Sequence, residues 1–404
     1  MVTSLILAIG IMIVAGFFAG MLAHRFRFPR VTGYIITGIL LSPSVTGLIA
    51  GAAVENLEIY TSIALGIIAY SIGGSLRLER IRQLESSIAW ITPLQAVGTW
   101  FLTALVVTLV APFIVQASDS SWLHTYFPMA FVIGAIASAT APATVMAITR
   151  EYRARGPLTT TLLSIVAIDD AAAILMFSIA MGVASGLTGV AGGFSLPRML
   201  GAPVLEILQS LGIGAALGFL LIPVARLMKS RSLLLVIVLG AIMLCVGIAE
   251  TLEVSLILAN MVLGVVVCNV AHRKDLFSVV DDIEDVIFAI FFVLAGMHFD
   301  LQAMQTAGLV AGLIFAARFA AKYSGTMAGA HVARSPVEVK KYLGLALMPA
   351  AGVSLGLALL AQRAFPDLGD TIYNAILATV VLNEIVGPPL ARLAIVRAGE
   401  QHSD

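Results

Sequence analysis

Two adjacent carboxylates, Asp169 and Asp170, are the residues of this chain best placed to do chemistry. They lie within the stretch from Leu158 to Val183, which contains no other charge and is long enough to span a membrane as a helix. A carboxylate at the centre of a bilayer costs about 3 kcal/mol, and two neighbours also repel each other. A pair kept there indicates a functional site rather than a structural accident.

Two basic residues, Arg318 and Lys322, lie inside a second apolar run, 306–332. Being four residues apart, they share one face of a helix. At about 1.5 Å per residue, Arg318 and the aspartates each lie roughly 18 Å from the end of their run. Because a buried charge needs an opposite charge, we expect the two carboxylates to face the two cations.

Two apolar runs contain residues that break helices. The first reads Ser138-Ala-Thr140-Ala141-Pro142-Ala-Thr144, and the second reads Met348-Pro349-Ala-Ala-Gly352. A proline removes a backbone donor and clashes with the preceding turn, so carbonyl groups are freed at membrane depth. Such groups are tolerated only where they are buried in protein or line a watery cavity.

Oxygen atoms near the first break could bind a hard monovalent cation such as Na⁺. The carboxylates of Asp170 and Asp169, the hydroxyls of Thr140 and Ser138, and carbonyls near Ala141 are the candidate ligands. Adjacent residues of a helix point about 100° apart, so Asp170 can face an ion cavity while Asp169 turns toward the cationic helix. Protons and the cation would then compete for one site.

The elements that must position these residues are membrane helices. Apolar residues make up 60% of the 404 residues and charged residues only 11%, against about 25% charged in soluble domains. We count thirteen apolar runs long enough to span the hydrocarbon core, and they leave no room for a soluble domain. These runs lie near 3–21, 32–50, 58–76, 87–115, 127–149, 158–184, 201–225, 232–249, 254–270, 280–299, 306–332, 342–362 and 370–391.

Basic residues set the expected topology. With thirteen spans and the N-terminus outside, 19 of the 23 Lys and Arg residues fall in inner segments and two, Arg198 and Arg363, fall in outer loops. The prediction is therefore an outer N-terminus and a short cytoplasmic tail, 392–404. The net charge of zero gives no reason to expect a nucleic-acid partner.

The two broken runs occupy matched places in the chain. Each is preceded and followed by a long run, and the predicted topology gives the two groups opposite orientations. Inverted repeats with broken helices are typical of secondary transporters. The sequence thus predicts an all-α membrane transporter.

Other acidic residues have two open interpretations. Glu384, before Pro388 and Pro389, could lie on an ion path. Alternatively, it could form a structural salt bridge, or its side chain could extend to the cytoplasmic surface. Asp282 and Asp285, with Asp281 and Glu284, crowd the inner start of the run 280–299. They could gather cations, or they could be a solvated helix start.

At these residues the chain resembles the monovalent cation:proton antiporter superfamily, in the branch of bacterial sodium/proton antiporters with a paired-aspartate helix. The blocks that carry the resemblance are "SATAPATV", "SIVAIDDAAAI", "FFVLAGMHFDL", "RFAAKYSG" and "VLNEIVGPPL". The resemblance covers essentially the whole chain.

The resemblance implies a core domain with two crossed, unwound helices that moves like an elevator against a dimerisation domain. Dimerisation or scaffold helices would be 1–86, core helices 87–185, scaffold and linker helices 200–300, and further core helices 306–391. The implied protein is a homodimer in a bacterial inner membrane. It needs no cofactor and exchanges Na⁺, or Li⁺, for protons.

The resemblance also implies roles for single residues. Asp170 matches the principal ion carboxylate, and Asp169 matches the aspartate of electrogenic members. Lys322 matches the lysine that pairs with the first aspartate, with Arg318 as a competitor. One departure is Ala141, because many relatives have Asp between the corresponding Thr and Pro.

Three other classes of membrane protein share some of these features. A potassium/proton antiporter would use nearly the same scaffold and is the main alternative, and a sodium-coupled organic-anion symporter is more distant. An intramembrane aspartyl protease needs carboxylates from separate helices that share one water, whereas neighbours in one helix diverge. We therefore do not expect an enzyme.

Overall fold

The computed structural model describes residues 4–79, 85–114, 121–188, 196–228, 230–271, 273, 275–299, 301–350, 352–365 and 368–402. Within these residues every regular element is helical, as predicted. The chain divides into two compact units. Unit 1 comprises Met1–Leu84, Met146–Glu151 and Val204–His298, and unit 2 comprises Glu85–Val145, Tyr152–Pro203 and Phe299–Asp404.

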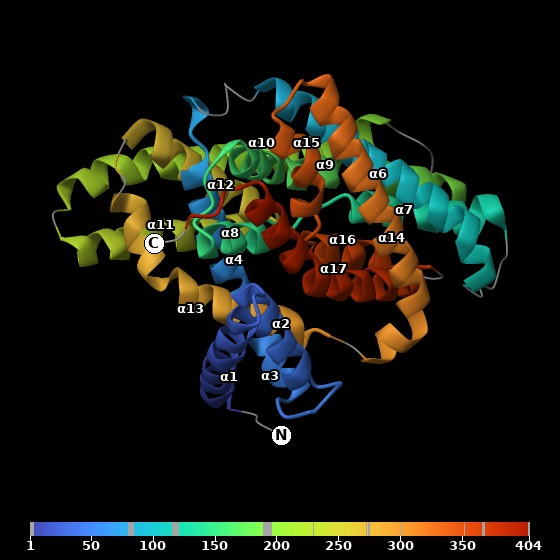
Figure 1. Cartoon of the computed structure of the whole chain (residues 1–404), viewed down its shortest axis with the longest axis horizontal. Helices are drawn as coiled ribbons and strands as arrows, with labels where there is room; N and C mark the ends of the chain where they lie inside the picture. The colour runs from blue at the N-terminus through green and yellow to red at the C-terminus, as the bar shows by residue number, and fades with distance from the viewer. Residues whose placement is uncertain are drawn as a thin grey trace. The chain divides into compact units, whose positions relative to one another are not determined.

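Unit 1 is built from helices near the N-terminus and in the middle of the chain (Figure 1). Its helices are α1 (Leu5–Arg25), α2 (Arg30–Leu41), α3 (Gly51–Asn56), α4 (Glu58–Ser75), most of α10 (Leu196–Leu227), α11 (Arg231–Thr251), α12 (Leu256–Val266), the π-helix η2 (Val267–Ala271) and α13 (Asp275–Met297). Helices α2 and α13 approach closely where Gly38 faces Gly296. A Cβ on Gly38 would lie 2.1 Å from the Val293 carbonyl oxygen, so only glycine fits there.

Unit 2 carries the residues singled out above at the two helix breaks. Its helices are α6 (Glu85–Ile114), the π-helix η1 (Trp122–Tyr126), α7 (Phe127–Ala137), the start of α8 (Pro142–Glu151), α9 (Pro157–Thr188), α14 (Leu301–Val332), α15 (Val337–Ala346), α16 (Gly352–Ala364) and α17 (Gly369–Arg397). Figure 1 shows α14 alongside α6, and a hydrogen bond of 2.8 Å joins Ser87 and Ser335 beside this contact.

Both predicted breaks are present as interruptions between short helices. Helix α7 ends at Ala137 and α8 begins at Pro142, while α15 ends at Ala346 and α16 begins at Gly352. Pro142 is the first residue of α8, where its missing N–H is not needed, and it disfavours a helical Ala141. The 138–141 and 347–350 segments are joined by a hydrogen bond from the Ala141 N–H to the Pro349 carbonyl, 2.9 Å long.

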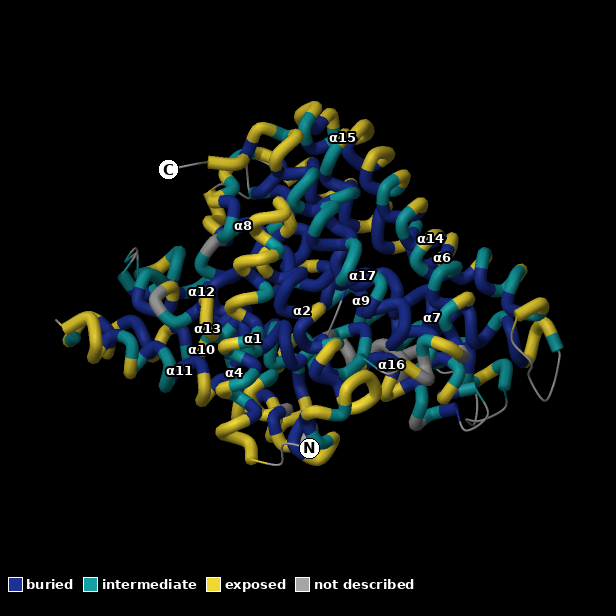
Figure 2. Tube along the Cα trace, turned by 60° about the horizontal axis from the view of Figure 1, so that its bottom comes forward, coloured by how far each residue is buried: buried dark blue, intermediate teal, exposed yellow. Residues whose placement is uncertain are grey.

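Each interrupted segment has a long helix on either side in the sequence. Helices α6 and α9 have 30 and 32 residues, and α14 and α17 have 32 and 29. At 1.5 Å per residue these helices are about 45 Å long, which exceeds the hydrocarbon core. Figure 2 shows that α9 and α17 are largely buried. Neither helix has a distinct polar face, which is typical of helices that pack against neighbours on several sides.

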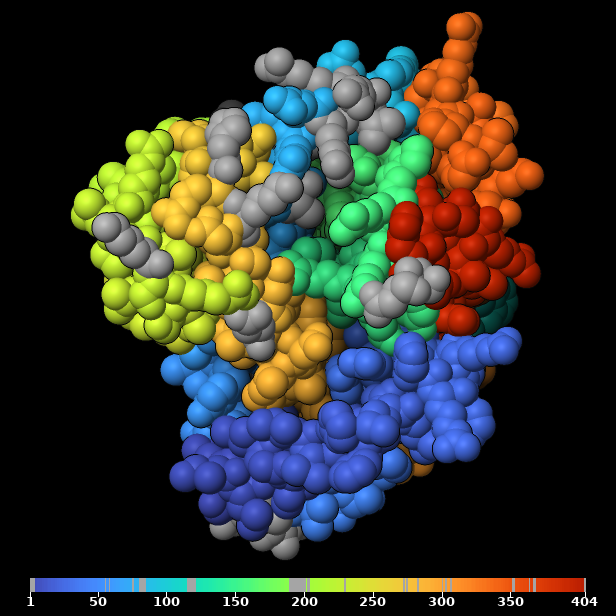
Figure 3. Space-filling model, turned by 60° about the vertical axis from the view of Figure 1, so that its left-hand side comes forward, coloured from blue at the N-terminus to red at the C-terminus, as the bar shows by residue number. Residues whose placement is uncertain are grey.

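The surface is that of a membrane protein. Large apolar side chains are exposed along α1, including Ile6 and Phe18, and along α10 and α11, including Leu220 and Val236. The yellow-green helices α10 and α11 form part of this surface in Figure 3. In the described residues, eight helices are long and apolar enough to cross a membrane, with three shorter apolar helices besides. Several membrane spans are therefore established, and the count of thirteen stays a prediction.

Candidate functional site

Asp169 lies at the centre of a buried polar cluster. Its carboxylate accepts hydrogen bonds from the Gln95 amide and from the Thr140 hydroxyl, the latter 2.6 Å long. The Lys322 ammonium lies 3.1 Å from Asp169 Oδ2 and also donates to Gln95 Oε1 at 2.9 Å and Thr140 Oγ1 at 2.6 Å. The charge of Asp169 is therefore neutralised and hydrogen-bonded within unit 2.

Asp170, its neighbour in α9, has a different environment. The residue is 3% exposed, and in the described part of the chain neither carboxylate oxygen has a hydrogen-bond partner. The two aspartates diverge as expected for adjacent residues of a helix. Buried polar groups are nearly always hydrogen-bonded, so a carboxylate without a protein donor needs an explanation outside the fold itself.

Arg318 organises the two helix breaks. Its guanidinium donates to the carbonyls of Ala137 at 2.8 Å, Ala139 at 2.8 Å and Met348 at 2.6 Å, and to the Asn383 side chain at 2.9 Å. The carbonyl ends of α7 and α15 carry partial negative charge, and a buried cation with several donors satisfies them. The expected contact of Arg318 with the aspartates is therefore wrong, because backbone carbonyls occupy its donors.

Glu384, in α17, lies at the opposite end of the first break. Both of its carboxylate oxygens lie 3.1 Å from the hydroxyl of Thr144, the third residue of α8. The first turn of a helix carries partial positive charge, so a buried carboxylate there is favourable. The structural salt bridge considered for Glu384 is absent from the described residues, where its hydrogen-bond partner is a hydroxyl.

Two other predicted residues, Ser138 and Thr140, are placed differently from the expectation. The Ser138 hydroxyl donates to Ala135 within its own helix end, at 2.6 Å. Thr140 serves Asp169 and Lys322 rather than Asp170. Pro349 lies within the second break and Gly352 is the first residue of α16, and the Pro349 carbonyl accepts from the Ala141 N–H.

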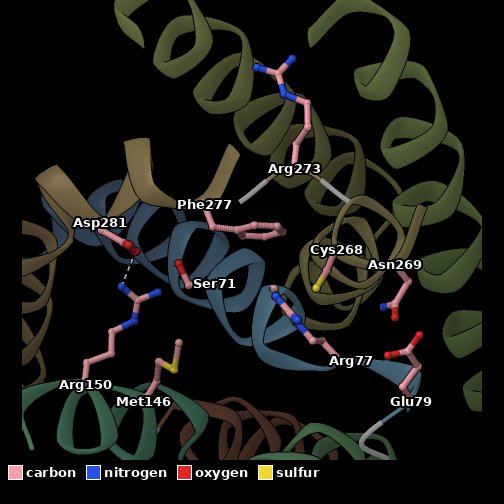
Figure 4. A pocket seen from close by; sticks show the side chains of 11 residues that line it. Ser71, Arg77, Glu79, Met146, Arg150, Cys268, Asn269, Arg273, Phe277 and Asp281 are labelled. Atoms are coloured by element: carbon pink, nitrogen blue, oxygen red, sulfur yellow. Dashed lines mark hydrogen bonds and ion pairs between the residues drawn. The ribbon is translucent and has the colours of Figure 1, made fainter. Parts of the chain in front are cut away.

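The acidic residues at the start of α13 lie in unit 1, beside a polar cavity of about 410 Å³. Asp281 and Glu284 both pair with Arg150, and Figure 4 shows Arg150 and Asp281 pointing toward each other across this cavity. Asp285 is exposed, and the side chain of Asp282 lies outside the described residues. Because Arg150 neutralises two of the four acidic side chains, this cluster does not form a purely acidic funnel for cations.

Arg273 also lines the cavity and interacts locally. It donates to the Asp275 carboxylate and, at 2.8 Å, to the Ala225 carbonyl. The hydrogen bond from Arg273 holds the pKa of Asp275 below its usual range.

Gln95 and Asn383 contribute to the site and were not predicted, and Thr144 was predicted only as part of the first break, not as a partner of Glu384. Gln95 is fully buried and joins Asp169 to Lys322. It is the one amide in the long apolar stretch of α6, and that isolation was a usable signal. Asn383 directly precedes Glu384, and nothing in its local sequence marks it as a partner of Arg318.

These features define a class of protein. It is a multi-pass membrane protein with a buried, partly uncompensated carboxylate pair beside two interrupted helices whose carbonyl ends share one arginine. Irregular backbone and ionisable groups at membrane depth are the marks of an ion or substrate transporter.

Comparison with known proteins gives the family. The sequence profile of the family described as "Sodium/hydrogen exchanger, transmembrane" matches residues 11–393, and the chain belongs to this family. It is thus a member of the monovalent cation:proton antiporter superfamily, which consists of transporters rather than enzymes, as the sequence motifs indicated.

Two individual relatives match nearly the whole chain, and a third matches part of it. The chain is 24% identical over 405 residues to the Na(+)/H(+) antiporter NhaS4 of Synechocystis sp., covering 96% of this chain and 97% of the relative. A 100-residue stretch is 33% identical to an uncharacterised protein of Methylorubrum extorquens, covering 24% of this chain and 36% of that protein. The structure of the sodium proton antiporter MjNhaP1 from Methanocaldococcus jannaschii at pH 8 has a TM-score of 0.74 at 18% identity, covering 97% of this chain and 98% of that one.

Proposed function

We propose that this protein exchanges a monovalent cation, foremost Na⁺, for protons across a membrane, with Asp170 as the shared binding group. The observation that carries the proposal is the contrast within the aspartate pair. Asp169 has three partners in the protein, whereas Asp170 is equally buried and has no partner in the described residues. Because Asp170 has no protein partner in the described residues, its carboxylate can release one bound ion and accept another.

Competition for one carboxylate is sufficient for exchange. A proton or Na⁺ neutralises Asp170, and the neutral site can cross the membrane. The empty, charged site cannot, because the bare anion would be buried without compensation. Each crossing therefore carries either Na⁺ or protons, and the opposite fluxes of the two ions are coupled.

The charged residues at the helix breaks support this role because they compensate the partial charges of the helix ends. Arg318 occupies the carbonyl ends of α7 and α15, which would otherwise attract the transported cation away from Asp170. Glu384 lies at the amino end of α8 through Thr144, where the residue before Pro142 is Ala141 instead of an acidic residue. We propose that Glu384 supplies the negative charge that an aspartate at position 141 would supply.

The transport step that we propose is an elevator movement. The helices that hold the aspartates would slide against the remaining helices, which would form a homodimer in a bacterial inner membrane with the N-terminus outside. We propose that two protons return for each Na⁺, the second carried by the Asp169–Lys322 pair, so that transport is electrogenic. Li⁺ is an expected second substrate, and K⁺ is the alternative cation.

Flux through reconstituted protein tests this function. Proteoliposomes with an internal pH dye are given outward or inward gradients of Na⁺, Li⁺ or K⁺, with choline as the control cation. We expect Na⁺ to move protons in the opposite direction, and Li⁺ to act similarly. Proton movement with K⁺ alone would favour the potassium/proton alternative, and no cation-dependent proton movement would contradict antiport.

A further inference from the structure

The C-terminal segment 398–402 binds the start of the helix that carries the aspartates. Helix α17 ends at Arg397, and Gly399, at φ +71°, turns the chain back. The carboxylate of Glu400 then accepts hydrogen bonds of 2.7 Å from the N–H groups of Leu158 and Thr159, and a third of 2.7 Å from the Thr159 hydroxyl. Glu400 therefore caps the amino end of α9 from a distant part of the chain.

The Glu400 carboxylate is buried in this contact and closely packed against Gly156. Glu400 is 4% exposed. A Cβ on Gly156 would lie 2.3 Å from the Glu400 carboxyl carbon, so glycine at 156 makes room for the carboxylate. A negative charge on the first N–H groups of a helix satisfies orphan donors and interacts favourably with the helix dipole.

Backbone and ring contacts extend the attachment. The Arg155 N–H donates to the Glu400 carbonyl at 3.0 Å, and the His402 N–H donates to the Tyr152 carbonyl at 3.3 Å. The Arg392 guanidinium lies 5.4 Å from the centre of the Tyr152 ring. The end of α17 and the connection between α8 and α9 are thus held together at several points.

The attachment acts on the ion site through two helices. Asp170 lies about 20 Å along α9 from its capped end. Release of that end would change both the position of α9 and the mobility of the turns between the cap and Asp170. Helix α17, at the other side of the attachment, carries Asn383 and Glu384, which bind Arg318 and Thr144 at the breaks. Glu400 therefore fixes α9 against the helix that positions the breaks.

We propose that Glu400 is a positioning residue for exchange, and that it sets the cation affinity of Asp170 by holding α9 in register with α17. The proposal rests on the proposed function of Asp170. It gives residue 400, which follows the end of α17, an indirect role at the ion site.

Two variants disrupt the attachment from opposite sides. Glu400→Gln removes the charge, and Gly156→Ala leaves Glu400 intact but fills its space. Glu338→Gln is the matched control, because Glu338 also lies in a first helical turn of unit 2 and has no hydrogen bond or ion pair in the described residues. Sodium-dependent proton flux is measured at a series of Na⁺ concentrations and pH values, with equal amounts of folded protein.

We expect both variants to lower the apparent Na⁺ affinity by up to about fivefold, the equivalent of a lost helix cap, and to shift the pH profile. The control should leave both unchanged. Normal affinity and pH profile in the folded variants, with only less protein recovered, would show a merely structural role and overturn the proposal.

Hydrogen exchange separates this proposal from the proposed function, because it requires no transport. In Glu400→Gln and Gly156→Ala, faster amide exchange should extend from Leu158 along α9 to Asp170. Faster exchange confined to the first turn would overturn the proposal even if the unaltered protein exchanges ions. Absence of transport by the unaltered protein would instead count against the antiport function.

Discussion

The Lys322 ammonium lies 3.1 Å from Asp169 Oδ2, while the adjacent Asp170 has no partner in the described residues. Two chemically identical side chains, one residue apart, thus have different environments. The ion pair, together with Gln95 and Thr140, satisfies the carboxylate of Asp169 and leaves that of Asp170 without a partner in the described residues.

The ion pair should be energetically coupled. Lys322→Ala leaves Asp169 buried and charged, so we expect it to destabilise the protein by about 3 kcal/mol. In an Asp169→Asn background the same change should cost much less, because the group left behind is neutral. Thermal unfolding of the two single variants and the double variant in detergent measures the coupling. Additive effects would disprove it.

Gln95 should stabilise the same cluster. Gln95→Ala removes a donor from Asp169 and an acceptor from Lys322, and we expect a loss of about 1–3 kcal/mol. Thr103→Val is a suitable control in the same helix, because Thr103 is fully buried and its hydroxyl has no partner in the described residues. Similar unfolding temperatures for the two variants would show that Gln95 has no special role.

Glu384 should be replaceable by a carboxylate at the break. Glu384→Gln removes the negative charge near the first turn of α8 and should reduce exchange and stability. Ala141→Asp places a carboxylate directly before Pro142, at a position favoured for helix capping, and should restore part of the loss. Exchange rates of the single and double variants test this. A double variant no better than Glu384→Gln would refute the compensation.

Exchange should respond to voltage. If each cycle moves net charge, an inside-negative potential set with K⁺ and valinomycin must change both the rate and the end point of proton movement. The same rate and end point at zero and at the imposed potential would establish electroneutral exchange.

Exchange should also weaken as the pH falls, because protons displace Na⁺ from Asp170.

Much of the site was predictable because charge in a membrane is costly. Asp169, Asp170, Arg318 and Lys322 could be found by their position inside apolar runs, and the breaks could be found from Pro142 and Pro349. The partner of each charge was harder to predict. Helical spacing places Arg318 and Lys322 on one face, and only the packed structure shows that backbone carbonyls take the donors of Arg318.

The contacts that were missed depend on long-range packing. Gln95 meets Lys322 across 227 positions of sequence, and Glu400 meets Leu158 across 242. No local periodicity encodes such pairs. In the same way, the pairing of Asp281 and Glu284 with Arg150 could not be read from the acidic run alone, which suggested a cation funnel.

Na⁺ binding and Na⁺-driven proton flux by Asp170→Asn test whether Na⁺ and the proton share Asp170. Asparagine keeps the size of the side chain but cannot be charged or titrate, and Ser164→Ala in the same helix is the control. We predict a folded, inserted protein that neither binds Na⁺ in calorimetry nor moves protons in response to a Na⁺ gradient, while the control does both. Robust Na⁺-driven proton flux by folded Asp170→Asn would contradict the account.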